Sequence, residues 1–354
     1  GASARPNWLL DSSLGAQWAA DINNRLTGTL QVVSKRAVNR DYTPRTEWAF
    51  LAYRLNNHVA LRAGRIGTPY FLVSDYRNLN AANPWVRPPV DVYGQVPFSW
   101  EDGADVILRN SIGKSHLSAQ IYSGKAKNLA WVGSPFTIKL KNLHGINLTW
   151  EYGVHTFRIS HNESKVSVDD FNDLNQLMTL LQSPAVTQSC GDCPALTDHY
   201  AIRNDNILFQ GIGWQADWPT GMLIAEVTRR QAPSILADTR AWYVTGLYRF
   251  GRIAPYVTVS RIAQTSPTQD QTLPAIDAPL INLLRSAIDA AVSDIGQRTH
   301  SVGVRWDINQ NLDAKLQWDH VQTADRQVAG YAIIRNSEFS GRYNVVSASL
   351  DFTF

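Results

Sequence analysis

The C-terminal stretch of the chain, residues 342–354, alternates strictly between apolar and polar side chains. The apolar positions are Val346, Ala348, Leu350, Phe352 and Phe354. The positions between them are Ser347, Ser349, Asp351 and Thr353. A period of two is that of a β-strand with one apolar face. The pattern therefore predicts a strand that runs to the last residue of the sequence.

The same period of two recurs along the chain in pairs of segments. The predicted strands are 12–22, 25–36, 46–55, 58–66, 98–109, 113–123, 136–150, 154–161, 206–217, 221–230, 239–250, 252–263, 297–308, 312–322 and 342–354. Most pairs are separated by short polar turns such as Asn23-Asn24 and Asn309-Gln310-Asn311, which is typical of β-hairpins.

The connections alternate between short and long. Turns of a few residues stand at one end of the strands, and the other end carries the segments 37–45, 67–97, 124–135, 162–205, 231–238, 264–296 and 323–341. A β-sandwich with Greek-key crossings has no reason for this strict alternation. The pattern favours one antiparallel up-and-down sheet that forms a single domain over residues 1–354.

The polar face of these strands carries charges where a globular protein would have a core. The candidate lumen residues are Lys35, Arg54, Arg62, Asp105, Arg109, Arg158, Arg249, Arg305 and Lys315, and the alternation also places Lys139 and Lys141 on the inner face. Charges inside and apolar side chains outside indicate a β-barrel with a water-filled lumen. An excess of Lys and Arg along a lumen favours anions.

Composition agrees with a membrane setting. The sequence has no run of 18 apolar residues, so a transmembrane helix is excluded. Trp, Tyr and Phe number 12, 13 and 11. Several aromatic residues flank the short turns or the chain end, as in the interfacial girdles of barrels; they are Tyr53, Trp150, Tyr152, Trp218, Phe250, Trp306 and Phe354. The net charge of +3 is too small and scattered to indicate nucleic-acid binding.

The terminal Phe354 with its alternating apolar partners resembles the closing strand of Gram-negative outer-membrane β-barrels, and the chain as a whole is similar to general porins. The resemblance implies an all-β transmembrane barrel of about 16 strands, 15 of them visible here, with periplasmic short turns and external long loops. It further implies a homotrimer in contact with outer-membrane lipid and lipopolysaccharide, and a Phe354 signal read by the barrel assembly machinery. The implied function is passive diffusion of small hydrophilic solutes, without cofactor or metal.

The segment 67–97 resembles the third external loop of general porins, which folds into the lumen and narrows it. Its candidate constriction residues are Asp75, Arg77, Arg87 and Asp91. If the loop enters, we expect Asp75 and Asp91 to face arginines of the wall, which would create a transverse field that filters dipolar solutes. If it stays outside, these residues are solvated loop charges.

Two other long loops contain helical spacing of apolar residues. The helices are predicted at 169–183, within the loop 162–205, and at 276–295, within the loop 264–296. They could pack on each other or over the rim of the barrel, or act as a gating plug. The first loop also holds Cys190 and Cys193, without a second Cys pair, which favours a small structural disulfide over a zinc or redox site.

Three other functions compete with a general porin. The spacing His116-Leu117-Ser118 resembles that of outer-membrane phospholipases, yet the alternation turns both polar residues into the lumen, away from lipid. No phosphate-binding glycine loop or metal-ligand cluster is found in the sequence. A substrate-specific channel and a non-transporting barrel such as an adhesin are the remaining alternatives.

The strand count raises a question about the start of the chain. Fifteen strands would leave the barrel with an odd number and an open seam, whereas bacterial single-chain barrels have even numbers. We therefore expect one further strand before residue 1, and no direct pairing between segments 12–22 and 342–354. Residues 1–6 lack the features of a signal peptide, so the sequence is either a mature chain or one that has lost its start.

Overall fold

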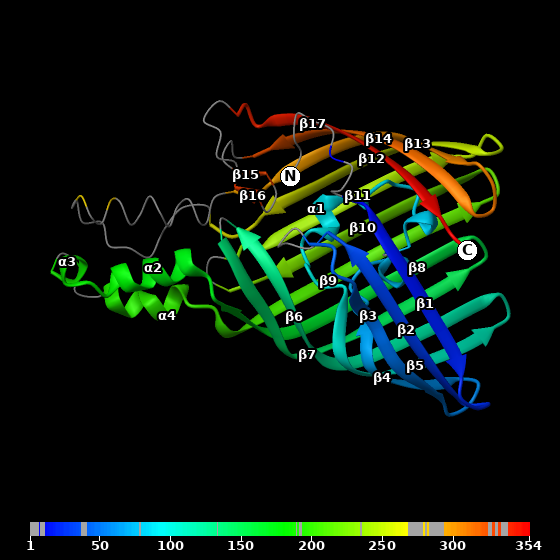
Figure 1. Ribbon diagram of the computed structural model, residues 1–354, viewed down its shortest axis with the longest axis horizontal. Coiled ribbons are helices and arrows are strands. Elements are labelled where there is room, and N and C mark those ends of the chain that lie inside the picture. Colours follow the sequence, from blue (N-terminus) through cyan, green and yellow to red (C-terminus); the bar gives the residue numbers. More distant parts are fainter. Residues whose placement is uncertain are drawn as a thin grey trace.

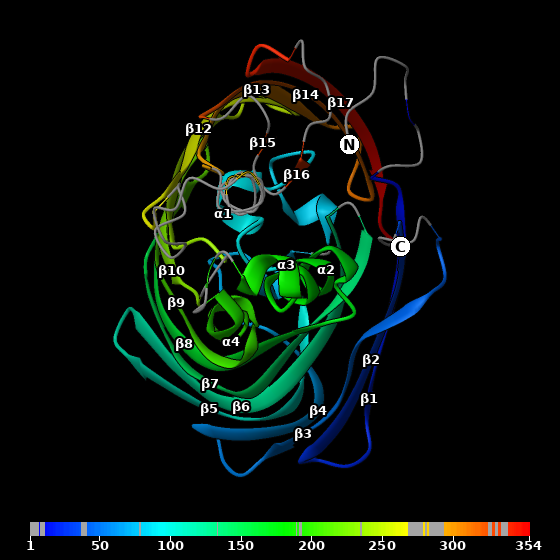
Figure 2. The ribbon, with the colours of Figure 1, turned by 90° about the vertical axis from the view of Figure 1, so that its left-hand side faces the viewer.

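A computed structural model describes residues 7, 11–36, 41–77, 79–132, 134–188, 190, 193–233, 236–267, 279, 282, 294–324, 328–329, 332–333 and 339–354. The described residues are mainly strand, arranged as one curved wall around a central space (Figures 1 and 2). The predicted helix at 276–295 falls almost entirely outside the described residues.

Fifteen strands form a single sheet in which every neighbouring pair is antiparallel. Their bounds are β1 (Ser13–Asp21), β2 (Leu26–Lys35), β3 (Arg45–Arg54), β4 (Val59–Gly67), β5 (Trp100–Ile112), β6 (Ser115–Val132), β7 (Ser134–Tyr152), β8 (His155–Asp169), β9 (Arg203–Trp218), β10 (Gly221–Gln231), β11 (Thr239–Tyr248), β12 (Ile253–Gln264), β13 (Gln297–Asp307), β14 (Leu312–Thr323) and β17 (Arg342–Phe352). A separate small hairpin consists of β15 (Val328–Ala329) and β16 (Ala332–Ile333). The up-and-down order predicted from the sequence is confirmed.

Strands β1 and β17 are the two ends of this order. Each pairs with one neighbour among the described strands, β1 with β2 and β17 with β14. The expectation of a further strand before residue 1 is not tested by this arrangement and stays a prediction.

Helical segments occupy the long connections. They are η1 (Ser74–Tyr76), η2 (Asn80–Ala82) and α1 (Val90–Tyr93) between β4 and β5, and α2 (Asn172–Leu181), α3 (Pro184–Thr187), η3 (Cys193–Ala195) and α4 (Leu196–Tyr200) between β8 and β9. The second group projects beyond the long-loop end of the wall (Figure 1). None of the described helices has the length and apolar character to cross a membrane.

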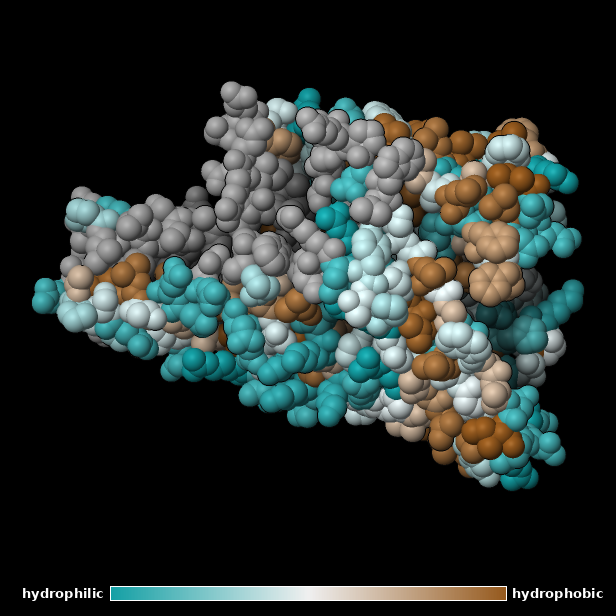
Figure 3. Space-filling model, viewed as in Figure 1, coloured by the Kyte–Doolittle hydropathy of each residue, from teal (hydrophilic) through white to brown (hydrophobic). Residues whose placement is uncertain are grey.

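The two faces of the wall differ as the alternation predicts. Leu148, Ile159 and Val257 are about half exposed on the outer face, whereas Asn147, Ser160 and Thr258 beside them are buried on the inner face. In Figure 3 hydrophobic residues gather toward the short-turn end and hydrophilic ones over the outer ends of β6 and β7. The chain thus presents apolar side chains outward and polar ones inward.

The hairpin β6–β7 is longer than predicted. The ladder continues to the pair Val132 and Ser134, so most of the segment 124–135 is strand instead of loop. The ladders shift register between Gly124 and Ala126 and between Lys141 and His144, and Asn142 has a positive φ of 49°. These bulges reverse the alternation.

As a result, Lys139 and Lys141 do not face the lumen. Leu140 between them is buried on the inner side, while Lys141 is exposed on the outer side. Lys139 forms an ion pair with Asp169 across the outer face of β8. The prediction of lumen lysines on this strand was wrong because a strict period of two cannot anticipate a bulge.

Candidate functional site: the lumen and its inserted loop

The segment between β4 and β5 folds into the space enclosed by the wall (Figure 2). It contributes a cluster of buried side chains that includes Tyr70, Phe71, Trp85 and Tyr93. A loop outside the barrel would leave such residues in water, so their burial against the wall fixes the loop inside.

The first leg of the loop is bound by Arg158 of β8. One guanidinium nitrogen lies 3.0 Å from Oδ2 of Asp75 and 3.4 Å from the carbonyl oxygen of Leu72. Ser160 donates a hydrogen bond of 2.9 Å to the carbonyl oxygen of Tyr70. Arg158 is buried, whereas the Asp75 side chain is 72% exposed. Asp75 therefore contacts a wall arginine directly while it remains open to solvent.

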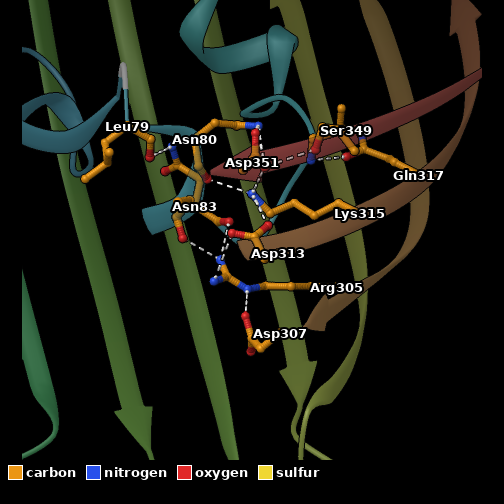
Figure 4. A network of polar contacts seen from close by, with 12 residues as sticks. Leu79, Asn80, Asn83, Arg305, Asp307, Asp313, Lys315, Gln317, Ser349 and Asp351 are labelled. Carbon is orange, nitrogen blue, oxygen red and sulfur yellow. Dashed lines mark hydrogen bonds and ion pairs between the residues drawn. The ribbon is translucent and has the colours of Figure 1, made fainter. Parts of the chain in front are cut away.

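The middle of the loop is held by charges from the last strands (Figure 4). Lys315 Nζ lies 2.6 Å from the Asn80 carbonyl oxygen and 2.9 Å from Asp351 Oδ2. Asn80 also donates to Asp351, at 2.9 Å. Arg305 donates to the carbonyl oxygens of Ala81, at 2.6 Å, and Asn83, at 3.1 Å. The loop and the three strands β13, β14 and β17 meet in this network.

Asp307 and Asp313 complete the network. Arg305 Nε lies 2.7 Å from Asp307, and Asp313 lies 3.5 Å from Arg305 and 3.3 Å from Lys315. The two cations are therefore balanced by three carboxylates, Asp307, Asp313 and Asp351. Their charge serves mainly to hold the loop and is not free to attract anions.

Trp85 anchors the next part of the loop. Its side chain is 1% exposed, and Nε1 donates to Thr245, at 3.0 Å, and to Thr258, at 3.1 Å. The next backbone N–H, that of Val86, donates to Gln317 at 3.1 Å. A buried indole whose N–H is fully satisfied is a strong and specific contact.

Helix α1 turns Asp91 toward neutral partners. Oδ1 accepts from Gln297 at 2.6 Å, and Oδ2 accepts from Ser260 at 2.7 Å. Burial raises the pKa of Asp91 above its usual range, and nearby Asp319 adds repulsion, while the hydrogen bonds oppose this rise. The expectation that Asp91 faces an arginine was wrong, since the short helix directs the carboxylate into the wall.

The two loop arginines also lie against neighbours. Arg77 stacks near the rings of Phe71 and Tyr93, at 5.7 Å and 5.8 Å from their centroids. Arg87 contacts Ser347 of β17 and lies 3.6 Å from Asp11. Of the two predicted loop carboxylates, Asp75 is exposed and Asp91 is buried.

A carboxylate that the sequence analysis did not single out is central to docking. Glu226 on β10 is buried and accepts from the Leu72 backbone N–H at 2.9 Å and from the Tyr93 hydroxyl at 3.0 Å. It joins the two ends of the loop. The sequence indicates this role of Glu226 only through its position on the inner face of the strand, between the inward residues Ile224 and Thr228.

Most side-chain hydrogen bonds of the loop are made with β8 to β14 and β17. Further predicted wall residues lie on the inner face of β3 to β5. Arg62 pairs there with Asp105, with Nε 3.0 Å from Oδ1, and Gln120 also donates to Asp105. Arg109 is exposed, and no ion pair to it is found within the described part of the chain. Arg54 donates to the Asn24 carbonyl oxygen at 2.5 Å.

The other predicted wall cations lie nearer the two ends of the strands. Lys35 forms an ion pair of 3.0 Å with Glu47. Arg249, beside a short turn, lies 2.8 Å from Asp217 and donates to the Trp218 carbonyl oxygen at 2.6 Å. Both are balanced by carboxylates.

The loop between β8 and β9 contains the disulfide Cys190–Cys193, with Cα atoms 5.4 Å apart. Both cysteines are buried in a small apolar cluster with Leu174, Leu181 and Val186. The predicted helix at 169–183 corresponds to α2, which carries Leu174 and Leu181. The helices of the loop between β8 and β9 therefore pack on one another.

The arrangement around His116 does not suit acyl transfer. Its Nδ1 lies 2.8 Å from Ser111 Oγ in an exposed setting, while Leu117 and Ile121 face outward. Among the described residues, no group of three or more His, Cys, Asp or Glu could hold a metal ion.

An open sheet of antiparallel strands with a polar interior and an inserted loop defines the class of porin-like transmembrane β-barrels. No known sequence family and no curated protein matches the chain. Solved structures do match it. The anion-selective porin from Comamonas acidovorans aligns with a TM-score of 0.59 at 9% identity, covering 97% of this chain and 90% of the porin.

Two further structures have the same architecture. OmpF of Salmonella typhi, solved in complex with daunomycin, has a TM-score of 0.57 at 13% identity and covers 96% of this chain and 89% of its own. The outer-membrane channel DcaP of Acinetobacter baumannii has a TM-score of 0.52 at 10% identity, with coverage of 96% and 84%. At these identities the likeness shows the fold: the chain has the fold of Gram-negative outer-membrane porins.

Proposed function

We propose that the protein is an outer-membrane porin of a Gram-negative bacterium and lets small hydrophilic solutes diffuse passively through its lumen. The observation that carries this proposal is the inserted loop 67–97, which is bound to one side of a polar interior by Arg158, Trp85 and Lys315. Such a loop narrows a passage without blocking it, and sieving needs no catalytic group.

A mild preference for anions accompanies this function. On the inner face of β3 to β5, Arg54, Arg62 and Arg109 stand with Asp105 and with the buried Glu101. The Arg62–Asp105 pair is neutral, and the two other arginines lack a carboxylate partner within the residues described. A local excess of cationic groups in a lumen raises the concentration of anions there.

The constriction would lie between Asp75 and the opposite wall. Because the Asp75–Arg158 pair remains open to solvent on the carboxylate side, it faces Arg62 and Arg109 across the passage in this proposal. Opposite charges on two sides of a narrow channel create the transverse field expected of a filter for dipolar solutes. Arg77, Arg87 and Asp91 would support the loop without lining the passage.

Single-channel recording in planar lipid bilayers tests this function. The refolded chain should give resolved conductance steps whose reversal potential in a salt gradient shifts toward the anion. Saturation of the current by one solute would favour a substrate-specific channel. A silent bilayer with correctly folded protein would exclude the porin function and favour an adhesin.

We further propose a homotrimer whose contact face is the outer surface of β1–β4. Small residues on this face, among them Ala20, Gly28, Ala49 and Ala63, border a hollow of about 450 Å³ beside Trp18. Small side chains allow close approach of a neighbouring subunit. One neighbour of similar fold, OmpT of Vibrio cholerae, has been solved in a trimer form.

Sedimentation in detergent tests the trimer. Ala49→Trp fills this hollow and should shift the protein from trimer to monomer. Ala119→Trp, on the outer face of β6, is the matched control and should leave the trimer intact. A wild-type protein that sediments as a monomer, or equal behaviour of the two variants, would exclude this interface.

A further inference from the structure

Four arginines form a row on the outer face of the barrel near its long-loop end. They are Arg229 on β10, Arg240 on β11, Arg261 on β12 and Arg298 on β13, and all are exposed. Their strand neighbours Thr228, Thr239, Ser260 and Gln297 are buried on the inner side. The guanidinium groups therefore extend away from the lumen.

The register places these arginines directly against one another. Arg229 is opposite Arg240, and Arg261 is opposite Arg298. Arg240 and Arg261 are diagonal neighbours, because Arg261 is opposite Trp242. Like charges opposite each other on adjacent strands destabilise a sheet. No carboxylate ion pair to any of the four is found over the described ranges, so the repulsion is not relieved there.

The row lies where the apolar outer surface ends. Along β11 the outward residues between the short turn and Arg240 are Tyr248, Gly246, Val244 and Trp242. Arg240 is the first charged outward position after this apolar run. A barrel's lipid-facing band is roughly 25 Å tall and ends in interfacial aromatic residues such as Trp242. The arginines are thus at the height of lipid headgroups in the external leaflet.

A similar pattern occurs on β6–β8. Lys127 is opposite Lys139, and Lys141 is opposite Lys165. Of these lysines, Lys139 is paired with Asp169, while Lys127, Lys141 and Lys165 are exposed. Two groups of paired cations at the same end of the barrel indicate a common purpose that the passage of solutes does not explain.

We propose that the arginine row binds the phosphate groups of an anionic lipid in the external leaflet. Arg offers a planar set of donors that binds phosphate in a bidentate manner, and two facing arginines could hold one phosphate between them. The acyl chains of the same lipid would lie over Val227, Val244 and Val257 below the row. This inference rests on the proposed outer-membrane location.

Binding of bisphosphorylated lipid A to the refolded full chain in detergent micelles tests the proposal, with native mass spectrometry as the readout. Wild-type protein should retain the lipid. Arg240→Gln with Arg261→Gln should weaken retention at least tenfold. The matched control, Arg25→Gln with Lys114→Gln, removes two exposed cations at the short-turn end and should change it less than twofold.

Other probes separate the sources of phosphate. Dephosphorylated lipid A should bind at least tenfold more weakly to the wild type, and inorganic phosphate should not compete at millimolar concentration. The proposal would be overturned if both double variants lost lipid A retention equally, or if retention did not require the lipid phosphates. Competition by free phosphate would also overturn it. Conductance of the same variants is recorded in parallel, so a channel that conducts normally but binds no lipid A would refute the lipid site alone.

Discussion

The ammonium group of Lys315 lies 2.9 Å from the carboxylate of Asp351, and this pair joins the last two strands of the sheet beneath the inserted loop. The Lys315 side chain has no exposed surface, and that of Asp351 has 15%. The same ammonium also holds the loop through the Asn80 carbonyl oxygen. The pair thus links the closing strand of the wall to the position of the loop.

Removal of the Lys315 charge should destabilise this region. Lys315→Met leaves Asp313 and Asp351 close together without their shared cation, and loss of one partner of a buried pair costs about 3–5 kcal/mol. We expect the temperature at which the folded band disappears in heat-modified electrophoresis to fall. Lys114→Met, which removes an exposed cation at the short turn between β5 and β6, should change it little. Equal temperatures for the two variants would contradict the role of Lys315.

Trp85 should control the width of the passage. Trp85→Ala removes a buried indole and leaves Thr245 and Thr258 without their donor, at a cost of about 3–5 kcal/mol. Since the outer wall does not depend on this side chain, we expect the barrel to fold and the loop to detach. Single-channel conductance should rise. Leu79→Ala, at a loop position that is 51% exposed, is the control, and conductance equal to the wild type in the Trp85 variant would show that the loop does not set the width.

Arg109 should contribute to ion selectivity. Arg109→Glu reverses a charge that has no ion pair among the residues described, and the reversal potential in a salt gradient should move toward the cation. Arg62→Glu alone is less suitable, because it places a second carboxylate beside Asp105. The exchange Arg62→Asp with Asp105→Arg keeps the pair and should leave selectivity nearly unchanged. An unaltered reversal potential in folded Arg109→Glu would exclude this residue from the conducting path.

Docking of α1 should depend on pH through Asp91. Burial raises the pKa of this carboxyl, so the docked loop binds the proton more tightly than the released loop does. Docking is therefore strongest below the ordinary aspartate pKa of about 3.9 and weakens as the pH rises through the raised value. Current fluctuations from loop movement should be more frequent at pH 8 than at pH 4. Asp91→Asn should remove this difference; its persistence would assign the effect to another group.

The disulfide should be dispensable for the barrel. Cys190 and Cys193 are three positions apart, and so small a closed loop contributes little through chain entropy. Replacement of both by Ser should leave heat-modified migration and conductance intact. Thiol labelling of the native protein should fail until a reductant is added. Labelling without reductant, or loss of the folded band in the double variant, would contradict this expectation.

Much of the wall follows from sequence alone because a strand has a fixed period. Asp105, Arg158 and Lys315 point inward as the alternation requires, since apolar residues on both sides of each face outward. Lys139 does not follow this alternation, because two bulges shift the register of the strands around it. The alternation also did not predict the full length of the β6–β7 hairpin, because the part near the long-loop end has polar exposed residues and its sequence resembles that of a loop.

The docking of the inserted loop could be anticipated only in outline. The partner of Leu72 is Glu226, 154 positions away, and that of Trp85 is Thr258, 173 positions away. Such pairs depend on the curvature of the finished wall, which local patterns do not encode. The same holds for Asp91, whose direction is set by a single helical turn.

The separation between Asn80 and Asp351, 271 positions along the chain, has a consequence for assembly. Contacts between distant positions form late, because the entropy of closing a long stretch of chain must be overcome first. The loop emerges early but cannot reach its final partners until the last strand is in place. Folding should therefore pass through a stage in which the wall is largely built and its interior is still wide, and narrowing should be the final event.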